Sequence, residues 1–324
     1  MNTPFLWHNG HIKPWAEATV HVSTHALHYG SSVFEGERVY ATPEGPAYFR
    51  LADHTRRLFE SARVYEIQIG YSEQEIDEAC LEVIRANRLA SAYVRPIVFR
   101  GAGGLGVLPR DGAPVDVAIM ALQWGAYLGD AAEVGADVCV SSWHRPAPNT
   151  IPSWAKAGGN YLSSQLIGLE ARRGGYDEGI ALGPNGLLSE GAGENLFLVR
   201  RGRLLTPPSS AGILAGITRD SVVTLAHDLG IAVEERDLPR EALYAADEVF
   251  MTGTAAEITP VRSVDRKQVG NGAPGPITRA LRDAFFGLFD GRTPDRYGWL
   301  THVPAAAAQG RAFPHPQPAL EITA

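Results

Sequence analysis

Short apolar runs separated by turn residues fill the first fifty positions of the chain. Their spacing predicts strands of a small antiparallel sheet at residues 5–7, 18–20, 33–34 and 47–49. From residue 53 the apolar period lengthens to that of a helix, with Leu58, Ala62 and Tyr65 on its inner face and its end near Glu66. Asp53 is the expected N-cap, because its carboxylate can accept the free amides of the first turn.

A second helix is predicted from Ser72, which forms a capping box with Glu75 and so satisfies two free amides at the helix start. Residues 93–100 then follow the period of two of a strand, and residues 115–122 form another. The Gly-rich segment 101–114 between them is long enough to be a functional loop.

The second half of the chain again alternates between strand and helix patterns. Helices are predicted at residues 160–173, 217–229 and 278–289. Strands are predicted at residues 136–142, 178–182, 187–190, 196–199, 203–206 and 249–251. Asn185 and Gly186 stand between two apolar runs, which is a strong signal for a hairpin.

At 324 residues the chain is long enough for two domains. The stretch 123–135 is the predicted linker, and it divides a first domain at 1–122 from a second at 136–304. The final segment, 305–324, is rich in Ala, Pro and Gln and is predicted to be disordered.

Charge and composition exclude several classes of function. A net charge of −7 and a pI near 5.8, without a basic run interleaved with aromatics, argue against nucleic-acid binding. Cys80 and Cys139 are the only cysteines and lack metal-type spacing, so we expect a reducing compartment. No apolar run approaches the roughly 20 residues needed to cross a bilayer, and no signal-peptide pattern opens the chain. We therefore expect a cytoplasmic protein that binds neither nucleic acid nor membrane.

Lysine is rare in this sequence, and one lysine differs from the others. Of Lys13, Lys156 and Lys267, only Lys156 lies in a small, Gly-rich, weakly polar segment. It is either an isolated surface charge or a desolvated amine with a lowered pKa, which Schiff-base chemistry needs. Tyr161 follows five residues later. Glu190 stands at a predicted strand end beside glycines, where a carboxylate either points at a ligand or lies on the surface.

Two turns of the second half can bind anions. Residues 212–220 lead into a predicted helix that reaches Leu229, and glycines before a helix N-terminus leave free amides where phosphate binds well. The turn at 252–254 follows a buried strand and offers further amides and hydroxyls. An amine, an acid and phosphate donors are what pyridoxal phosphate requires. A cofactor-free Schiff-base aldolase needs no such pair of turns, and the sequence lacks the Rossmann and P-loop glycine motifs.

A further candidate is the strand that begins near Tyr93, which places this tyrosine and Arg95 on one otherwise apolar face. Such an arginine is either a bidentate carboxylate clamp or an edge-strand residue that reaches solvent. His21, His25 and His28 lie close in sequence, but no carboxylate or cysteine completes a metal-binding set. We interpret these histidines as structural and expect no metal.

A series of motifs resembles, in the same order, those of the bacterial branched-chain-amino-acid aminotransferases, fold-type IV pyridoxal-phosphate enzymes of the class IV aminotransferase family. The motifs lie at residues 25–30 (His-Ala-Leu-His-Tyr-Gly), 34–36 (Phe-Glu-Gly), 93–96 (Tyr-Val-Arg-Pro), 124–128 (Trp-Gly-Ala-Tyr-Leu), 155–162 (Ala-Lys-Ala-Gly-Gly-Asn-Tyr-Leu), 189–197 (Ser-Glu-Gly-Ala-Gly-Glu-Asn-Leu-Phe), 216–219 (Gly-Ile-Thr-Arg) and 252–258 (Thr-Gly-Thr-Ala-Ala-Glu-Ile). The resemblance implies a mixed α/β (α+β) fold with a small N-terminal domain, a larger cofactor-binding pseudo-barrel domain, and the site at their interface.

The resemblance also implies roles around the cofactor. Lys156 would form the Schiff base and move the proton between substrate and cofactor. Glu190 would pair with the pyridine nitrogen, Tyr161 would bind the ring hydroxyl, and Arg57 would bind the phosphate. The other expected cofactor contacts are Gly193, Leu214, Ile217, Thr218 and Thr254.

For the substrate, Tyr93 and the amides of Thr254 and Ala255 would hold the α-carboxylate, and Arg95 would reach the distal carboxylate of glutamate. The apolar wall for leucine, isoleucine and valine would consist of Tyr29, Phe34, Gly36, Trp124 and Tyr127. Leu105 and Val107 would complete that wall across a dimer interface.

The implied reaction is a reversible ping-pong transfer of an amino group between L-leucine, L-isoleucine or L-valine and 2-oxoglutarate, which gives branched 2-oxo acids and L-glutamate. The family implies a homo-oligomer built from dimers, often assembled into hexamers. A D-amino-acid aminotransferase, an amine transaminase and an aminodeoxychorismate lyase are alternatives within the fold; the strand of Tyr93 and Arg95 and the region of Trp124 favour the branched-chain enzyme. A non-catalytic cofactor-binding protein is the alternative of another class, and the joint presence of the lysine, tyrosine and glutamate argues against it.

Overall fold

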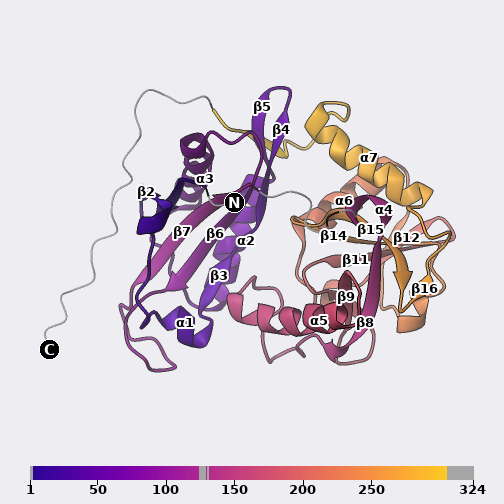
Figure 1. The fold of residues 1–324 in the computed structure, drawn as a ribbon, viewed down its shortest axis with the longest axis horizontal. Helices are drawn as coiled ribbons and strands as arrows, with labels where there is room; N and C mark the ends of the chain where they lie inside the picture. Colours follow the sequence, from indigo (N-terminus) through magenta and orange to yellow (C-terminus); the bar gives the residue numbers. More distant parts are fainter. Residues whose placement is uncertain (1–2, 124–128, 130, 305–324) are drawn as a thin grey trace, which may run out of the picture. The chain divides into compact units, whose positions relative to one another are not determined.

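The structure is a computed structural model that describes residues 3–123, 129 and 131–304. These residues form two compact units (Figure 1). The first unit contains residues 3–123, 155–159 and 295–304. The second contains residues 129, 131–154 and 160–294. Residues 124–128 and 130 of the predicted linker and the whole of the predicted tail, 305–324, lie outside the described residues.

The first unit is built on one sheet, which has eight strands among the described residues. The strand order is β17-β5-β4-β6-β7-β1-β2, and β3 pairs with β6. These strands are β1 (Phe5–His8), β2 (His11–Pro14), β3 (Ser32–Phe34), β4 (Glu37–Thr42), β5 (Gly45–Phe49), β6 (Ala92–Arg100), β7 (Val115–Leu122) and β17 (Leu300–His302). Its helices are α1 (His25–Tyr29), α2 (Leu51–Val64) and α3 (Glu73–Asn87). Helices α2 and α3 contact each other and pack on the sheet (Figure 1).

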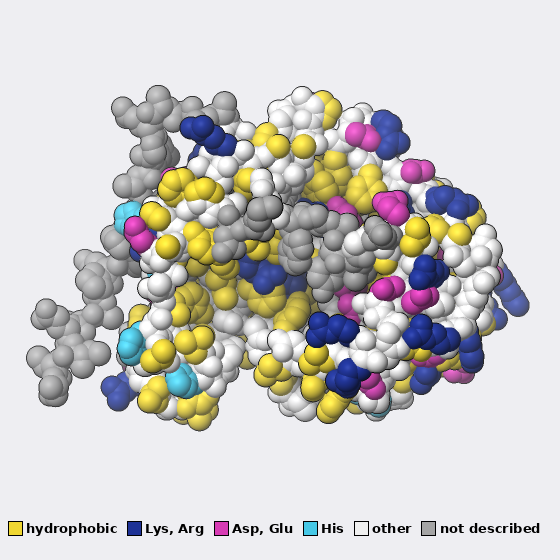
Figure 2. Space-filling view, in the orientation of Figure 1, with side chains coloured by type: hydrophobic (Ala, Val, Ile, Leu, Met, Phe, Trp, Pro, Cys, Tyr) yellow, Lys and Arg dark blue, Asp and Glu magenta, His cyan; other side chains and the backbone are white. Residues whose placement is uncertain are grey.

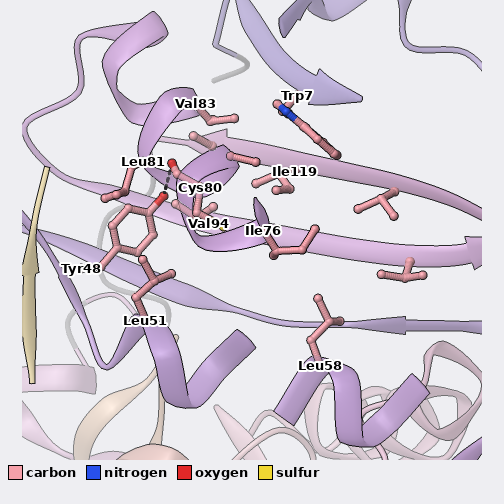
Figure 3. Close-up of a cluster of buried hydrophobic side chains, with 14 of the residues drawn as sticks. Trp7, Tyr48, Leu51, Leu58, Ile76, Cys80, Leu81, Val83, Val94 and Ile119 are labelled. Atoms are coloured by element: carbon pink, nitrogen blue, oxygen red, sulfur yellow. Dashed lines mark hydrogen bonds between the residues drawn. The ribbon is translucent and has the colours of Figure 1, made fainter. Parts of the chain in front are cut away.

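The core of the first unit lies where α2 and α3 cover the sheet (Figure 3). Leu58 of α2, Ile76 of α3 and Val94 of β6 are fully buried there, and each such burial stabilises the fold by about 1.5–3 kcal/mol. The Tyr48 hydroxyl donates to the Cys80 carbonyl at 2.7 Å, so the one polar atom of this buried aromatic side chain has a partner (Figure 3).

The starts of the two helices test the predicted caps. The capping box of α3 is confirmed, because the Glu75 carboxylate accepts from the Ser72 amide at 2.7 Å and the Ser72 hydroxyl accepts from the Glu75 amide at 3.2 Å. The predicted cap of α2 is wrong. This helix begins at Leu51 after Arg50, whose φ of 58° turns the chain out of β5. Asp53 lies in the first turn instead, where its carboxylate accepts from Arg50 Nε at 2.6 Å.

The predicted strand at residues 18–20 is also wrong. The amides of Ala18 and Thr19 are used in local turns, donating to the carbonyls of Trp15 and Glu17. Val20 is 48% exposed and so has no buried face to pack. Conversely, the pattern does not reveal six strands that are short or carry charged residues: β2, β4 and β17 of this sheet, and β13 (Val233–Glu235), β15 (Glu257–Val264) and β16 (Lys267–Gln268) further along the chain.

The second unit is built on another sheet, which has nine strands among the described residues. The order is β10-β9-β8-β15-β14-β11-β12-β13, and β16 pairs with β15. These strands are β8 (Ala136–His144), β9 (Glu178–Leu182), β10 (Leu188–Gly191), β11 (Asn195–Arg200), β12 (Arg203–Thr206), β13 (Val233–Glu235), β14 (Glu248–Gly253), β15 (Glu257–Val264) and β16 (Lys267–Gln268). Its helices are α4 (Ala131–Val134), α5 (Tyr161–Arg173), α6 (Ile217–Asp228) and α7 (Pro276–Asp290).

Helix α5 packs on β8 and β9, and α6 and α7 pack on each other and on β14 (Figure 1). The strands predicted at 178–182 and 203–206 coincide with β9 and β12. The mixed α/β fold class is therefore confirmed. None of the helices in the described part of the chain is long and apolar enough to cross a membrane.

Candidate active site

The segment that carries Lys156 is bound to the first unit through its backbone. The Lys156 amide donates to the Ser61 hydroxyl at 3.0 Å, and its carbonyl accepts from the Phe34 amide at 3.0 Å. Val33 and Ala157 form an isolated β-bridge beside these bonds. The predicted domain limits place this segment in the second domain, whereas these contacts hold it on β3 and α2 of the first unit.

Glycine is needed in this segment because two chains approach closely. A Cβ on Gly158 would lie 2.5 Å from the Ser32 hydroxyl oxygen. The Gly159 Cα would lie 3.1 Å from a Cβ on Gly30, which itself has φ of +64°. The Gly-rich character of the sequence around Lys156 therefore reflects backbone packing as well as chemistry.

The ε-amine of Lys156 lies over an aromatic ring. Its Nζ is 5.2 Å from the centre of the Phe34 ring, and the Arg95 guanidinium carbon is 4.6 Å from the same centre. Arg95 Nη2 donates to the Tyr93 hydroxyl at 2.7 Å, as the shared strand face predicts. Arg95 Nε is buried and has no hydrogen-bond partner among the described residues. An orphaned guanidinium nitrogen beside a lysine and two aromatic rings is suited to a carboxylate ligand.

Gly36 explains how Tyr93 reaches this position. A Cβ at residue 36 would lie 2.1 Å from the Tyr93 hydroxyl oxygen. No side chain other than hydrogen fits there while the tyrosine keeps its bond to Arg95. The structure thus brings together Phe34, Gly36, Tyr93, Arg95 and Lys156 within the first unit.

Arg57, the expected phosphate ligand, is held by a buried acid. Its Nε and Nη2 donate to the two oxygens of Glu35 at 2.7 and 2.8 Å, and His54 Nδ1 lies 2.7 Å from Oε2 of the same carboxylate. Burial alone would raise the pKa of Glu35, but Arg57 and the hydrogen bond from His54 hold that pKa well below its usual range. Arg57 therefore has a fixed orientation.

The remaining wall residues of the first unit are more exposed. The Tyr29 hydroxyl donates to the Leu105 carbonyl at 2.6 Å, while the Leu105 and Val107 side chains are 62% and 73% exposed. Figure 2 shows apolar side chains on the surface near α1, the helix of Tyr29. His25 of the same helix is buried, with its ring nitrogens 2.7 Å from the Ser31 hydroxyl and 3.0 Å from the Gly106 carbonyl. The predicted wall residues Trp124 and Tyr127 lie outside the described residues.

In the second unit, Glu190 is buried at the end of β10 and is held from three directions. Arg145 Nη2 lies 2.7 Å from Oε1, while Asn195 Nδ2 and the Leu214 amide donate to Oε2 at 3.1 and 3.0 Å. The surface interpretation of Glu190 is wrong, because the residue is only 5% exposed. Its carboxylate is fixed in place and suited to bind a cationic ring nitrogen.

The predicted anion turns are also in the second unit. Gly216 is the N-cap of α6, and Ile217 and Thr218 form its first turn. A Cβ on Gly216 would lie 1.9 Å from Asn195 Oδ1, so this glycine lets Asn195 bind Glu190. At the other turn, the Thr252 hydroxyl is buried without a partner among the described residues.

The other expected cofactor and substrate contacts of this unit lie in the same elements or next to them. Tyr161 is the first residue of α5, and Gly193 is exposed in the bend between β10 and β11. Thr254 and Ala255 form the turn between β14 and β15 and are partly buried.

Sequence reasoning missed Glu35, His54 and Arg145, which support Arg57 and Glu190. Glu35 lies in the Phe-Glu-Gly motif, so the motif marks it but not its partner. Arg145 is one of many arginines, and nothing in the pattern connects it with an acid 45 residues away.

Each unit by itself carries groups whose chemistry fits pyridoxal phosphate. The first unit contains a lysine, an arginine with a fixed orientation, and a guanidinium nitrogen that is orphaned among the described residues. The second unit contains a carboxylate held by three donors and a helix N-terminus.

The family comparison decides the class. The model of the family described as "Amino-transferase class IV" matches residues 32–264. The chain belongs to the class IV aminotransferase family. It is a transaminase, as the motifs predict, and enzymes of this class use pyridoxal phosphate.

Known relatives agree with this assignment. The branched-chain-amino-acid aminotransferase of Escherichia coli (strain K12) is 58% identical over 300 residues, which cover 92% of this chain and 97% of the relative. The enzyme of the same name from Pseudomonas aeruginosa is 46% identical, with the same coverage of each chain. A crystal structure of the Escherichia coli enzyme matches with a TM-score of 0.93, covering 93% of this chain and 100% of that one. The enzyme from Thermobaculum terrenum, crystallised in its PLP-form, matches at 38% identity and a TM-score of 0.87, covering 94% and 99%. The resemblance to branched-chain-amino-acid aminotransferases is thereby confirmed.

Proposed function

We propose that the chain transfers an amino group reversibly between L-leucine, L-isoleucine or L-valine and 2-oxoglutarate, with pyridoxal 5'-phosphate as cofactor and Lys156 as the catalytic residue. The observation that carries this proposal is the cluster of Lys156, Phe34, Tyr93 and Arg95, in which a buried guanidinium nitrogen has no partner among the described residues. The names of the relatives support the choice of branched-chain substrates.

The cofactor, when bound, supplies the carbonyl carbon that receives the amino group and a ring that withdraws electrons. We propose that Arg57 and Lys156 hold it from the first unit, and that the second unit contributes Tyr161, Glu190, Gly193, Leu214, Ile217, Thr218 and Thr254. Glu190 is suited to the ring nitrogen because its carboxylate is fixed by three donors. Thr218 and Ile217 are suited to the phosphate because they lie in the first turn of α6.

Lys156 has a second task as general base and acid. Its ε-amine would move the proton between the substrate Cα and the cofactor. The two backbone hydrogen bonds of Lys156 fix the point from which this side chain extends, and its Nζ lies 5.2 Å from the centre of the Phe34 ring. Proton transfer of this kind requires such control of position.

The substrate pocket must accept an apolar side chain and the side chain of glutamate in turn. Phe34 offers an apolar ring, and the Arg95 guanidinium carbon lies 4.6 Å from the centre of that ring, with an Nε that has no partner within the described chain. A branched side chain would pack on the ring, and a distal carboxylate would bind the guanidinium. Tyr93, with the amides of Thr254 and Ala255, would hold the α-carboxylate, and Tyr29, Gly36, Trp124 and Tyr127 would complete the wall.

We further propose a homodimer. Leu105 and Val107 are apolar and largely exposed, and we infer that they face the partner's substrate pocket. Cys80 and Cys139 are free and buried, which suits the reducing cytoplasm.

The proposal is tested by the colour of the purified protein. A visible absorption band should appear with pyridoxal 5'-phosphate and be absent from Lys156→Ala, because the band arises from the bond to that amine. The control is Lys267→Ala, whose amine lies 4.2 Å from the Tyr244 ring centre on the surface of the second unit. Wild-type protein that stays colourless in excess cofactor would refute the proposal.

Substrate assays distinguish the branched-chain-amino-acid aminotransferases from the D-amino-acid and amine transaminases of the same fold. With 2-oxoglutarate as acceptor, we expect turnover of L-leucine and none of D-alanine or a chiral amine. Preference for either of the last two would assign the chain to the D-amino-acid or the amine transaminases.

A further inference from the structure

Three residues of the first unit form a buried cluster, which we call the Glu35 triad: Glu35, His54 and Arg57. Their side chains are 0%, 1% and 10% exposed. Glu35 connects the other two, because Oε2 contacts both His54 Nδ1 and Arg57 Nη2. His54 and Arg57 lie on the same helix, α2, and Glu35 lies between β3 and β4.

The contacts determine which nitrogen of His54 carries its proton. Glu35 is ionised, since Arg57 and His54 outweigh the effect of burial on its pKa. An ionised carboxylate only accepts hydrogen bonds, so Nδ1 of His54 must donate. Nε2 is therefore the position at which a second proton can add.

The charges around His54 oppose that second proton. Burial is the largest cause that lowers the pKa of His54, and the positive charges of Arg57 and Lys156 lower it further, while Glu35 raises it. The neighbouring Glu37 favours its neutral form, because burial, then Glu35 and Asp77, raise its pKa well above the usual range. In the absence of a phosphate, the Glu35 triad is thus a neutral ion pair with a neutral imidazole.

A phosphate on Arg57 changes this balance. A phosphate ester carries about two negative charges near neutral pH, and the positive charge of Arg57 is already balanced by Glu35. A phosphate bound at Arg57 therefore adds net negative charge close to the Glu35 triad, which favours the protonated form of His54. A buried negative charge in excess is costly, and His54, which shares the Glu35 carboxylate with Arg57, can reduce it by taking a proton.

We propose that phosphate binding by Arg57 draws a proton from solvent onto Nε2 of His54, so that the Glu35 triad couples cofactor binding to pH. This inference rests on the proposed role of Arg57 as the phosphate ligand. Glu35 and His54 act here as positioning residues, because neither needs to touch the cofactor. The step adds one proton from water to one imidazole and breaks no other bond.

The test counts protons during binding. Full-length protein freed of cofactor is titrated calorimetrically with pyridoxamine 5'-phosphate, which cannot form the bond to Lys156. The titration is run between pH 5.5 and 8.5 in two buffers that differ in ionisation enthalpy. His54→Asn keeps a donor near the Nδ1 position and cannot take the proton. Because the phosphate's own titration is common to both proteins, the wild type minus His54→Asn gives the contribution of His54.

We expect this difference to be a proton uptake of about half a proton per site or more near pH 6, which disappears at pH 8.5. About half a proton is the maximum uptake when ligand binding raises the proton affinity of one group tenfold. Glu35→Gln should abolish the uptake too, because it removes the charge that favours protonated His54. The matched control is His25→Asn, since His25 is equally buried but contacts a hydroxyl and a carbonyl. It should keep the uptake of the wild type.

Equal proton numbers in the wild type and His54→Asn would overturn the inference, as would an uptake that persists in Glu35→Gln. If neither variant folds, histidine-labelled wild-type protein decides the question by NMR: one ring titration should move to higher pH when the ligand binds, and the absence of any such shift would overturn the inference. Failure of the proposed function looks different, because the wild type would then bind no pyridoxamine 5'-phosphate at all.

Discussion

Glu37 should make the stability of this protein depend on pH. The residue is 0% exposed in β4, and neither carboxyl oxygen has a hydrogen-bond partner among the described residues. The Cys80 thiol lies beside it and is only a weak donor. Burial, followed by the charges of Glu35 and Asp77, raises the pKa of Glu37 well above 4.5. The folded protein therefore keeps a proton that the unfolded chain releases as the pH rises.

The size and sign of the effect follow from that difference. Between pH 4.5 and the folded pKa, each pH unit lowers the free energy of unfolding by up to about 1.36 kcal/mol. Glu37→Gln cannot ionise in either state, so it should match the wild type near pH 4.5. As the pH rises above 4.5, the variant should become the more stable protein, by up to about 1.36 kcal/mol per pH unit until the folded pKa of Glu37 is reached.

Urea unfolding of cofactor-free protein at pH 5, 6 and 7 measures this difference. Glu78→Gln is the matched control, since Glu78 is exposed on α3 and its replacement should change stability by less than about 0.5 kcal/mol. If Glu37→Gln and the wild type lose stability in parallel as the pH rises, the reasoning about Glu37 is refuted.

Three further predictions concern the candidate site and its support. Arg95→Ala should raise the KM for glutamate and 2-oxoglutarate roughly 10- to 100-fold, which corresponds to the loss of a hydrogen bond to a charged group, and should raise the KM for leucine far less. An equal rise in KM for all three substrates would contradict the shared pocket. Gly216→Ala should place a Cβ 1.9 Å from Asn195 Oδ1 and so displace the side chain that binds Glu190. We expect urea unfolding to show a free energy of unfolding lower by about 1–3 kcal/mol, and cofactor titration to show a weaker affinity. Unchanged cofactor affinity would exclude a role for this contact. Burial raises the pKa of Glu178 to about 7, so this residue alone should lower the stability of the wild type by about 3 kcal/mol between pH 4.5 and 7. Urea unfolding of Glu178→Gln should therefore show a loss that is smaller by that amount over the same range; an equal loss in both proteins would contradict the prediction.

The sequence predicts those helices and strands that are determined by interactions between residues close together in the chain. The capping box at Ser72 and the short apolar runs of β7 and β9 need only neighbouring residues, and both predictions hold. The cap at Asp53 fails because Arg50 adopts a left-handed φ that a sequence pattern does not reveal for a non-glycine residue. Strand β4 is missed because Glu37 occupies a core position.

For the candidate site too, the sequence identifies residues within motifs but not the contacts between residues far apart in the chain. The motif around Lys156 identifies the amine, and its glycines prove to be needed for backbone packing. The supports of the site come from pairs that are distant in sequence. Glu35 and Arg57 are 22 positions apart, and Arg145 and Glu190 are 45 apart, so no period or spacing rule connects them. Only the folded arrangement shows which acid meets which arginine.

The order of the chain has a consequence for how the first unit is made. Its sheet receives its edge strand, β17 at Leu300–His302, only after the whole second unit has been synthesised, and the segment of Lys156 arrives between two stretches of that unit. Until then, β5 has an unpaired edge while the nascent chain is still growing on the ribosome. A fragment that ends near residue 123 would keep that edge permanently and lack the lysine. Fragments that divide this protein at its apparent boundary should therefore aggregate, whereas a truncation after residue 304 leaves every described strand in place.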